Sequence, residues 1–146
     1  MIDLRIPHYS LGKMDKLFFV IFNSYYKDNE FKNDNPPLTV GGLFTAMFFG
    51  IYMFFCYSYI IYQDVNARQG PTDTLAYLMV ILSLATTYFI FFWNKRYLTI
   101  YEKYKDDIAL RNKTTKFFCF FLVFFLIFSC LFLIAIRNKL VFGKWI

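Results

Sequence analysis

Three stretches without a charged residue, each long enough to cross a bilayer, constrain this chain more than any other feature. They cover residues 38–62, 75–93 and 117–136. An α-helix rises about 1.5 Å per residue, so helices of these lengths match or slightly exceed a hydrocarbon core about 30 Å thick. The sequence therefore predicts an all-α membrane protein with three transmembrane helices.

The length of the chain limits what else it can contain. Its 146 residues leave room for three spans, their connections and an N-terminal segment, but not for a soluble domain with a sizeable core of its own. We therefore expect an N-terminal segment over residues 1–37 and one transmembrane domain over residues 38–146. Between the first two spans, Gly70-Pro71 predicts a turn, and Thr72 or Asp73 is positioned to cap the second helix.

Lys and Arg are distributed unevenly between the two sides of this three-span arrangement. Twelve of them lie before the first span or between the second and third, and four lie on the other side. By the positive-inside rule, the N-terminus faces the inside and the C-terminus the outside. The expected location is a bacterial inner membrane or an organellar inner membrane.

The segment before the first span predicts an amphipathic helix at the membrane interface. Over residues 15–27, one helical face carries Lys16, Asn23 and Lys27, and the other carries apolar and aromatic side chains. Such a helix settles at headgroup depth, with Lys16 and Lys27 contacting the membrane surface. It serves either as an anchor or as a surface for a partner. Met14 is an alternative start of the chain.

The connection after the second span predicts a helix that extends into the cytoplasm. Tyr97, Tyr101, Tyr104 and Ile108 share one helical face, which either packs on the N-terminal helix or docks a partner. Basic, tyrosine-rich segments can bind single-stranded nucleic acid. Here the position of Lys95 and Arg96 at the end of a span indicates contact with anionic lipid instead, so no nucleic-acid partner is expected.

Small side chains within the spans indicate close helix packing. Gly42, Ala46 and Gly50 recur every four residues in the first span, and Ser83 and Thr87 do so in the second. These stripes serve either the packing of one three-helix unit or the formation of a homo-oligomer. The spans lack the ionisable residues that mark pumps and transporters. A pore lined by the hydroxyl groups of Ser83, Thr86 and Thr87 would need several subunits.

The chain also lacks a recognisable catalytic pattern. His8 is its only histidine, and Asp106 and Asp107 are adjacent and therefore diverge on a helix. Cys56, Cys119 and Cys130 all lie in the predicted spans, where they act as small hydrophobic residues. We expect no enzyme, no cofactor and no metal site.

Several short stretches of the chain carry a resemblance to other proteins. They are Lys16-Leu17-Phe18-Phe19, Tyr25-Tyr26-Lys27, Asp34-Asn35-Pro36-Pro37-Leu38-Thr39, Arg96-Tyr97 and Ile100-Tyr101-Glu102-Lys103-Tyr104-Lys105. In these stretches the chain resembles uncharacterised small multi-span membrane proteins of Bacteroidota. The resemblance implies no activity for particular residues. Similar aromatic-rich proteins occur as accessory subunits of organellar membrane complexes.

These observations favour a non-catalytic membrane protein that acts through protein–protein contacts in the bilayer. It would be an accessory subunit of a larger complex or a toxin-immunity-type inhibitor, with membrane lipids and other membrane subunits as partners. The alternative is a homo-oligomeric pore or membrane-perturbing effector.

Overall fold

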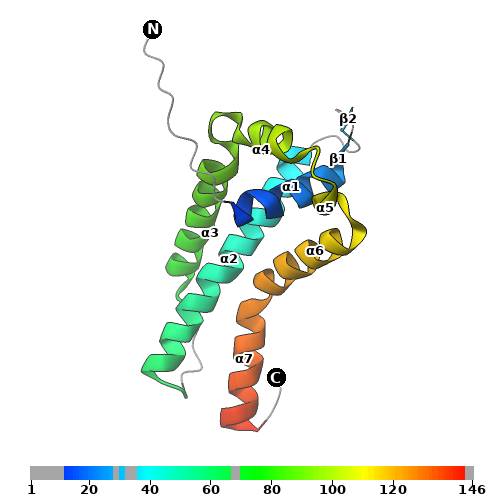
Figure 1. Ribbon diagram of the computed structural model, residues 1–146. Coiled ribbons are helices and arrows are strands. Elements are labelled where there is room, and N and C mark those ends of the chain that lie inside the picture. Colours follow the sequence, from blue (N-terminus) through cyan, green and yellow to red (C-terminus); the bar gives the residue numbers. More distant parts are fainter. Residues whose placement is uncertain (1–11, 28–29, 32–35, 67–69, 144–146) are drawn as a thin grey trace.

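The computed structural model describes residues 12–27, 30–31, 36–66 and 70–143, and these are almost entirely helical. Figure 1 shows α2 beside α3 on one side and α6 and α7 on the other, with α1 across one end. The elements in chain order are α1 (Lys13–Tyr25), β1 (Tyr26–Lys27), β2 (Glu30–Phe31), α2 (Pro36–Gln63), α3 (Asp73–Thr87), the π-helical turn η1 (Tyr88–Phe92), the 3₁₀ turn η2 (Trp93–Lys95), α4 (Arg96–Tyr104), α5 (Ile108–Arg111), α6 (Lys113–Ile127) and α7 (Ser129–Phe142).

The prediction of a helical chain with segments long and apolar enough to span a membrane is confirmed. Among the described residues, two helical segments are long and apolar enough to cross a membrane. They are Pro37–Gln63 in α2 and Asp73–Tyr104, which runs from α3 through η1 and η2 to α4. The pair α6 and α7 passes the same test together, which raises the number of candidate spans to three. The predicted cap of the second helix is also present, because the Thr72 side chain accepts a hydrogen bond from the Leu75 amide at 3.4 Å.

The second helix does not continue straight beyond the apolar stretch. After η1 and η2 the chain turns at Asn94 and Lys95, which have φ angles of 56° and 57°. This left-handed conformation interrupts a right-handed helix, and asparagine tolerates it better than most residues do. The expected extension is therefore the separate helix α4, which turns back to contact α1.

The third apolar stretch is bent rather than continuous. α6 and α7 meet at Phe128 with an angle of 57° between them. The Ser129 hydroxyl donates a hydrogen bond to the Leu126 carbonyl oxygen at 2.7 Å, a local side-chain bond of the kind that bends helices. The single helix expected over residues 117–136 thus becomes two, and Ser129 is the residue that marks the bend.

Helix α1 lies inside the protein rather than along its surface. It contacts α2, α4, α5 and α6, and five consecutive side chains are completely buried: Phe18, Phe19, Val20, Ile21 and Phe22. Of the expected polar face, Lys16 is exposed but Asn23 is buried. The helix forms close to the predicted range, but it belongs to the same core as the later helices, because helices cover it on more than one side.

Candidate membrane surface and docking sites

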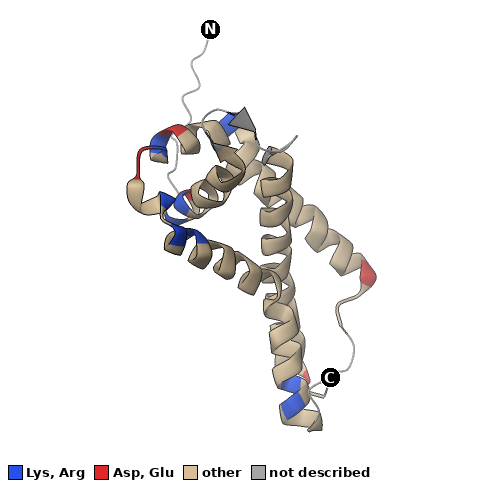
Figure 2. Ribbon diagram, turned by 90° about the vertical axis from the view of Figure 1, so that its right-hand side faces the viewer, with Lys and Arg blue, Asp and Glu red and all other residues tan. Residues whose placement is uncertain are grey.

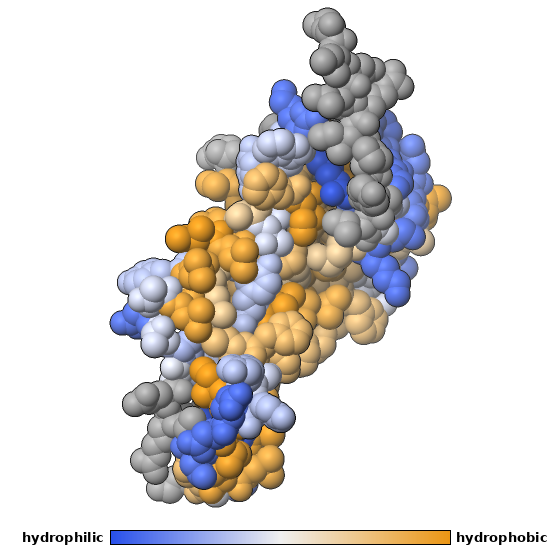
Figure 3. All heavy atoms as spheres, turned by 90° about the vertical axis from the view of Figure 1, so that its left-hand side faces the viewer, coloured by the Kyte–Doolittle hydropathy of each residue, from blue (hydrophilic) through white to orange (hydrophobic). Residues whose placement is uncertain are grey.

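A broad apolar surface separates two charged ends of the molecule. Charged residues lie on α1, α4, α5 and the start of α6 at one end, and near the end of α7 and the connection between α2 and α3 at the other (Figure 2). The space-filling view shows the same division (Figure 3). Exposed side chains of this surface include Ile81 at 63%, Phe89 at 60% and Phe121 at 60%. Apolar exposure on this scale is unfavourable in water and suits a hydrocarbon environment.

Hydroxyl groups join α2 to α3 within this apolar region. Thr45 Oγ1 donates to Thr87 Oγ1 at 3.2 Å, and the Tyr52 hydroxyl lies 2.8 Å from Thr86 Oγ1. Ser83, completely buried on α3, instead donates to the Met79 carbonyl within its own helix. Ser83 and Thr87 are therefore both buried where α3 packs on α2, as the small-residue pattern predicts. Thr45 belongs to the small-residue surface expected for the first span. Sequence reasoning missed Tyr52, because nothing in its spacing separates a hydroxyl that faces a helix from one that faces lipid.

The stripe of Gly42, Ala46 and Gly50 divides between two environments. Gly42 is exposed, and a Cβ atom there would meet nothing within 4 Å. Gly50 is buried, and a Cβ atom there would lie 2.7 Å from the Ile127 carbonyl oxygen and still closer to that of Leu126. Gly50 thus allows α2 to approach the backbone at the bend of the third apolar stretch. Ser129 reinforces this contact, because its hydroxyl also lies 3.4 Å from the Gly50 carbonyl oxygen.

An open groove of about 680 Å³ lies between α2 and α3. Gly41, Gly42 and Ala46 line it from α2, and Leu84 and Thr87 line it from α3. A Cβ atom at Gly41 would touch the Phe92 ring at 3.2 Å, so this ring packs directly on α2 at that end. The remaining lining residues are Pro37, Leu38, Thr45, Phe49, Val80, Tyr88 and Phe92.

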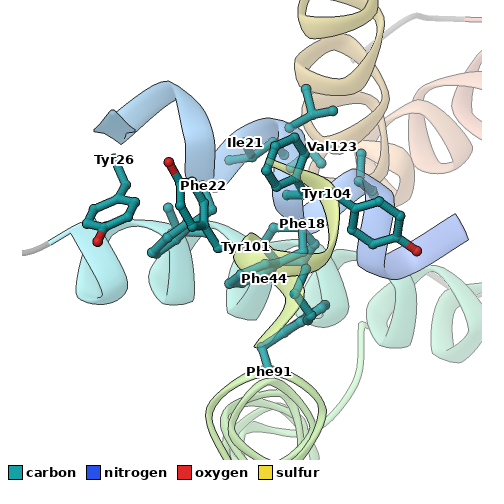
Figure 4. Close-up of a cluster of buried hydrophobic side chains, with 14 of the residues drawn as sticks. Phe18, Ile21, Phe22, Tyr26, Phe44, Phe91, Tyr101, Tyr104 and Val123 are labelled. Atoms are coloured by element: carbon teal, nitrogen blue, oxygen red, sulfur yellow. The ribbon is translucent and has the colours of Figure 1, made fainter. Parts of the chain in front are cut away.

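The tyrosine face of α4 is covered by α1. Tyr101 and Tyr104 are each 9% exposed, and both rings lie 5.9 Å from the ring of Phe19, measured between centroids. Tyr97 lies 5.9 Å from Phe22 in the same way (Figure 4 shows the surrounding cluster). Of the two expectations for this face, packing on the N-terminal helix is the one the contacts match. Ile108, the fourth residue of the predicted face, begins α5 and is 85% exposed.

The basic residues expected at the membrane surface have different environments. Lys16 and Lys95 are exposed, whereas the Lys27 side chain lies outside the described residues. Arg96 instead turns toward α1, and its Nη2 donates to both carboxylate oxygens of Asp15, at 2.9 and 3.3 Å. The Asp15 side chain is only 4% exposed. Sequence analysis did not predict this ion pair, because the two residues are far apart in the chain.

Asp15→Asn is expected to destabilise the protein by about 2 kcal/mol, because Arg96 then loses a charged partner in a largely buried position. Glu102→Gln is the matched control. It breaks the Glu102–Lys105 pair, whose side chains are 60% and 45% exposed, and such pairs contribute at most about 1 kcal/mol. Thermal unfolding in detergent, with a double-mutant cycle that includes Arg96→Gln, measures the coupling. A coupling near zero would contradict a structural role for the pair.

The described residues offer no cluster of three or more His, Cys, Asp or Glu side chains that could hold a metal ion. His8 lies outside them. Asp107 caps α5 by accepting hydrogen bonds from the Ala109 and Leu110 amides. Just after α4, the hydrogen bond from Lys105 to Glu102 raises the pKa of Lys105 above its ordinary value. Asp107, Glu102 and Lys105 therefore have local structural roles.

No protein-family model, curated protein or solved structure matches this chain. The resemblance to small membrane proteins of Bacteroidota therefore stays an expectation from the sequence.

Proposed function

We propose that this protein is a non-catalytic, three-span membrane protein that binds other membrane proteins within the bilayer, as an accessory subunit of a larger complex. A toxin-immunity-type inhibitor would use the same kind of contact. A row of aromatic rings on α6 and α7 carries the proposal. Phe117, Phe121, Phe125 and Phe132 stack in succession, with centroids 6.4, 6.5 and 5.7 Å apart.

This phenylalanine row has the properties of a preformed contact surface. Its rings are between 49% and 67% exposed, yet each already stacks on a neighbour of the same chain. Helix association in membranes depends on packing rather than on a hydrophobic driving force, so a surface that is already ordered loses little entropy on binding. The tyrosine face of α4, in contrast, is already covered by α1.

The alternative function, a homo-oligomeric pore, would need polar groups directed at a channel. The candidate lining hydroxyls of Ser83, Thr86 and Thr87 all take part in hydrogen bonds within the chain. A pore lined by them would have to share or break these bonds. The accessory-subunit proposal needs no such change.

Native mass spectrometry of the tagged protein, extracted from its own membranes in a mild detergent, tests the proposal. We expect a foreign membrane protein at a fixed ratio, and we expect Phe125→Ala to release it. The matched control is Leu82→Ala, which removes a side chain of the same exposed class on α3. A series of identical subunits would favour the pore instead. A monomer without any bound protein would contradict both functions.

The proposed orientation places the N-terminus inside and the C-terminus outside. Asn112-Lys113-Thr114 is a glycosylation sequon, and Asn112 is exposed at the start of α6. After translation into endoplasmic-reticulum microsomes, we expect no glycan at Asn112 and a glycan on an acceptor tag fused after Ile146. A Thr114→Ala variant supplies the unmodified mobility. Glycan addition at Asn112 would contradict this orientation.

A further inference from the structure

The groove between α2 and α3 extends over about half of the apolar region rather than across all of it. One wall runs from Pro37 to Phe49 along α2, and the other from Val80 on α3 to Phe92 at the end of η1. The α2 wall covers 12 residue steps, about 18 Å of helix, whereas one leaflet supplies about 15 Å of hydrocarbon. The groove therefore has the length of a single leaflet.

The end of the groove next to the charged surface of α1 and α4 has features of a headgroup site. Phe92 lines the groove there, and the turn that follows it contains Trp93, 47% exposed, and Lys95, also exposed. Tryptophan is typical of the membrane interface, and basic sites between transmembrane helices bind anionic headgroups. Arg96 is held by Asp15, so Lys95 is the cation of this turn that faces outward.

We propose that the groove binds one acyl chain of an anionic phospholipid from the leaflet on the α1 and α4 side, with its headgroup beside Lys95. A transmembrane helix of a partner fits less well. Such a helix is about 10 Å wide and continues through both leaflets, whereas the groove ends at Phe49 and Val80. An acyl chain matches both the length of the groove and its largely apolar lining.

Photocrosslinking in vesicles tests this proposal. The full-length protein is reconstituted in phosphatidylcholine that contains phosphatidylglycerol with a diazirine in one acyl chain, and mass spectrometry locates the adducts. We expect adducts to concentrate on groove residues such as Phe49 and Leu84. Gly42→Leu should abolish them, because its side chain enters open space in the groove. Leu131→Ala, which changes an exposed residue outside the groove, should leave them unchanged.

The headgroup is tested by comparing phosphatidylglycerol and phosphatidylcholine probes with the same diazirine chain. Lys95→Gln should reduce the preference for phosphatidylglycerol about fivefold, the effect of one lysine at a membrane surface. Equal labelling by both probes would overturn the anionic headgroup. Labelling spread evenly over Ile81, Phe89 and Phe121, and insensitive to Gly42→Leu, would overturn the acyl-chain site. A protein crosslink from Gly42→Cys in native membranes would also overturn it, because a partner chain would then occupy the groove.

Discussion

Gly50→Leu is expected to destabilise the protein by about 3 kcal/mol or more, the upper range for inserting a large side chain into a packed site. The Cβ atom of the new side chain already meets backbone atoms of α6, at Leu126 and Ile127. A helix backbone cannot move aside as a flexible side chain can. Gly50→Ala should destabilise in the same direction by a smaller amount. Thermal unfolding in detergent, followed by circular dichroism, measures the difference.

Gly42→Leu provides a closely matched control for this substitution. It introduces the same side chain into the same helix two turns earlier, where a Cβ atom meets nothing within 4 Å. We expect a change within about 0.5 kcal/mol, as for surface substitutions. If Gly50→Leu instead preserved stability and only removed self-association, the contact with α6 would be wrong and the glycine would belong to an interface between subunits.

The contrast between these two glycines shows what spacing alone can predict. Gly42, Ala46 and Gly50 follow one pattern, and the pattern indicates a helix with a small-residue surface. It does not indicate which partner each position meets. Residues four apart do not lie exactly above one another on an α-helix, so the direction of the stripe changes along α2. Gly42 borders the open groove beside α3, whereas Gly50 meets the bend at Phe128. That bend depends on a tertiary contact and on one serine hydroxyl, which hydropathy does not detect.

Apolar length was sufficient to locate the membrane helices, because the thickness of the bilayer imposes it directly. The ends of these helices were harder to predict. No proline or glycine marks the turn at Asn94 and Lys95 in the sequence. The Asp15–Arg96 ion pair joins residues that only the folded chain brings together. The sequence also indicated an interfacial helix at residues 15–27, since a short apolar run beside lysines has the same pattern whether lipid or protein covers it.

Phe18→Ala distinguishes these two environments of α1. The Phe18 ring is completely buried, and its centroid lies 4.3 Å from Phe91, in a stacked arrangement, and 5.4 Å from Phe44 (Figure 4). Truncating it leaves a cavity among these rings, and large-to-small changes of this kind cost about 3–5 kcal/mol. We therefore expect a large loss of thermal stability, measured in detergent.

Lys16→Ala, at an exposed position of the same helix, should change stability by no more than about 0.5 kcal/mol. A double-mutant cycle of Phe18→Ala with Phe91→Ala should give a coupling of about 0.5–1.5 kcal/mol, typical of paired aromatic rings. An interfacial helix predicts the opposite pattern: Phe18→Ala would weaken vesicle binding of the isolated segment but leave the stability of the protein unchanged. A start at Met14 would keep Asp15 and the buried residues of α1, so the same comparison applies to either start of the chain.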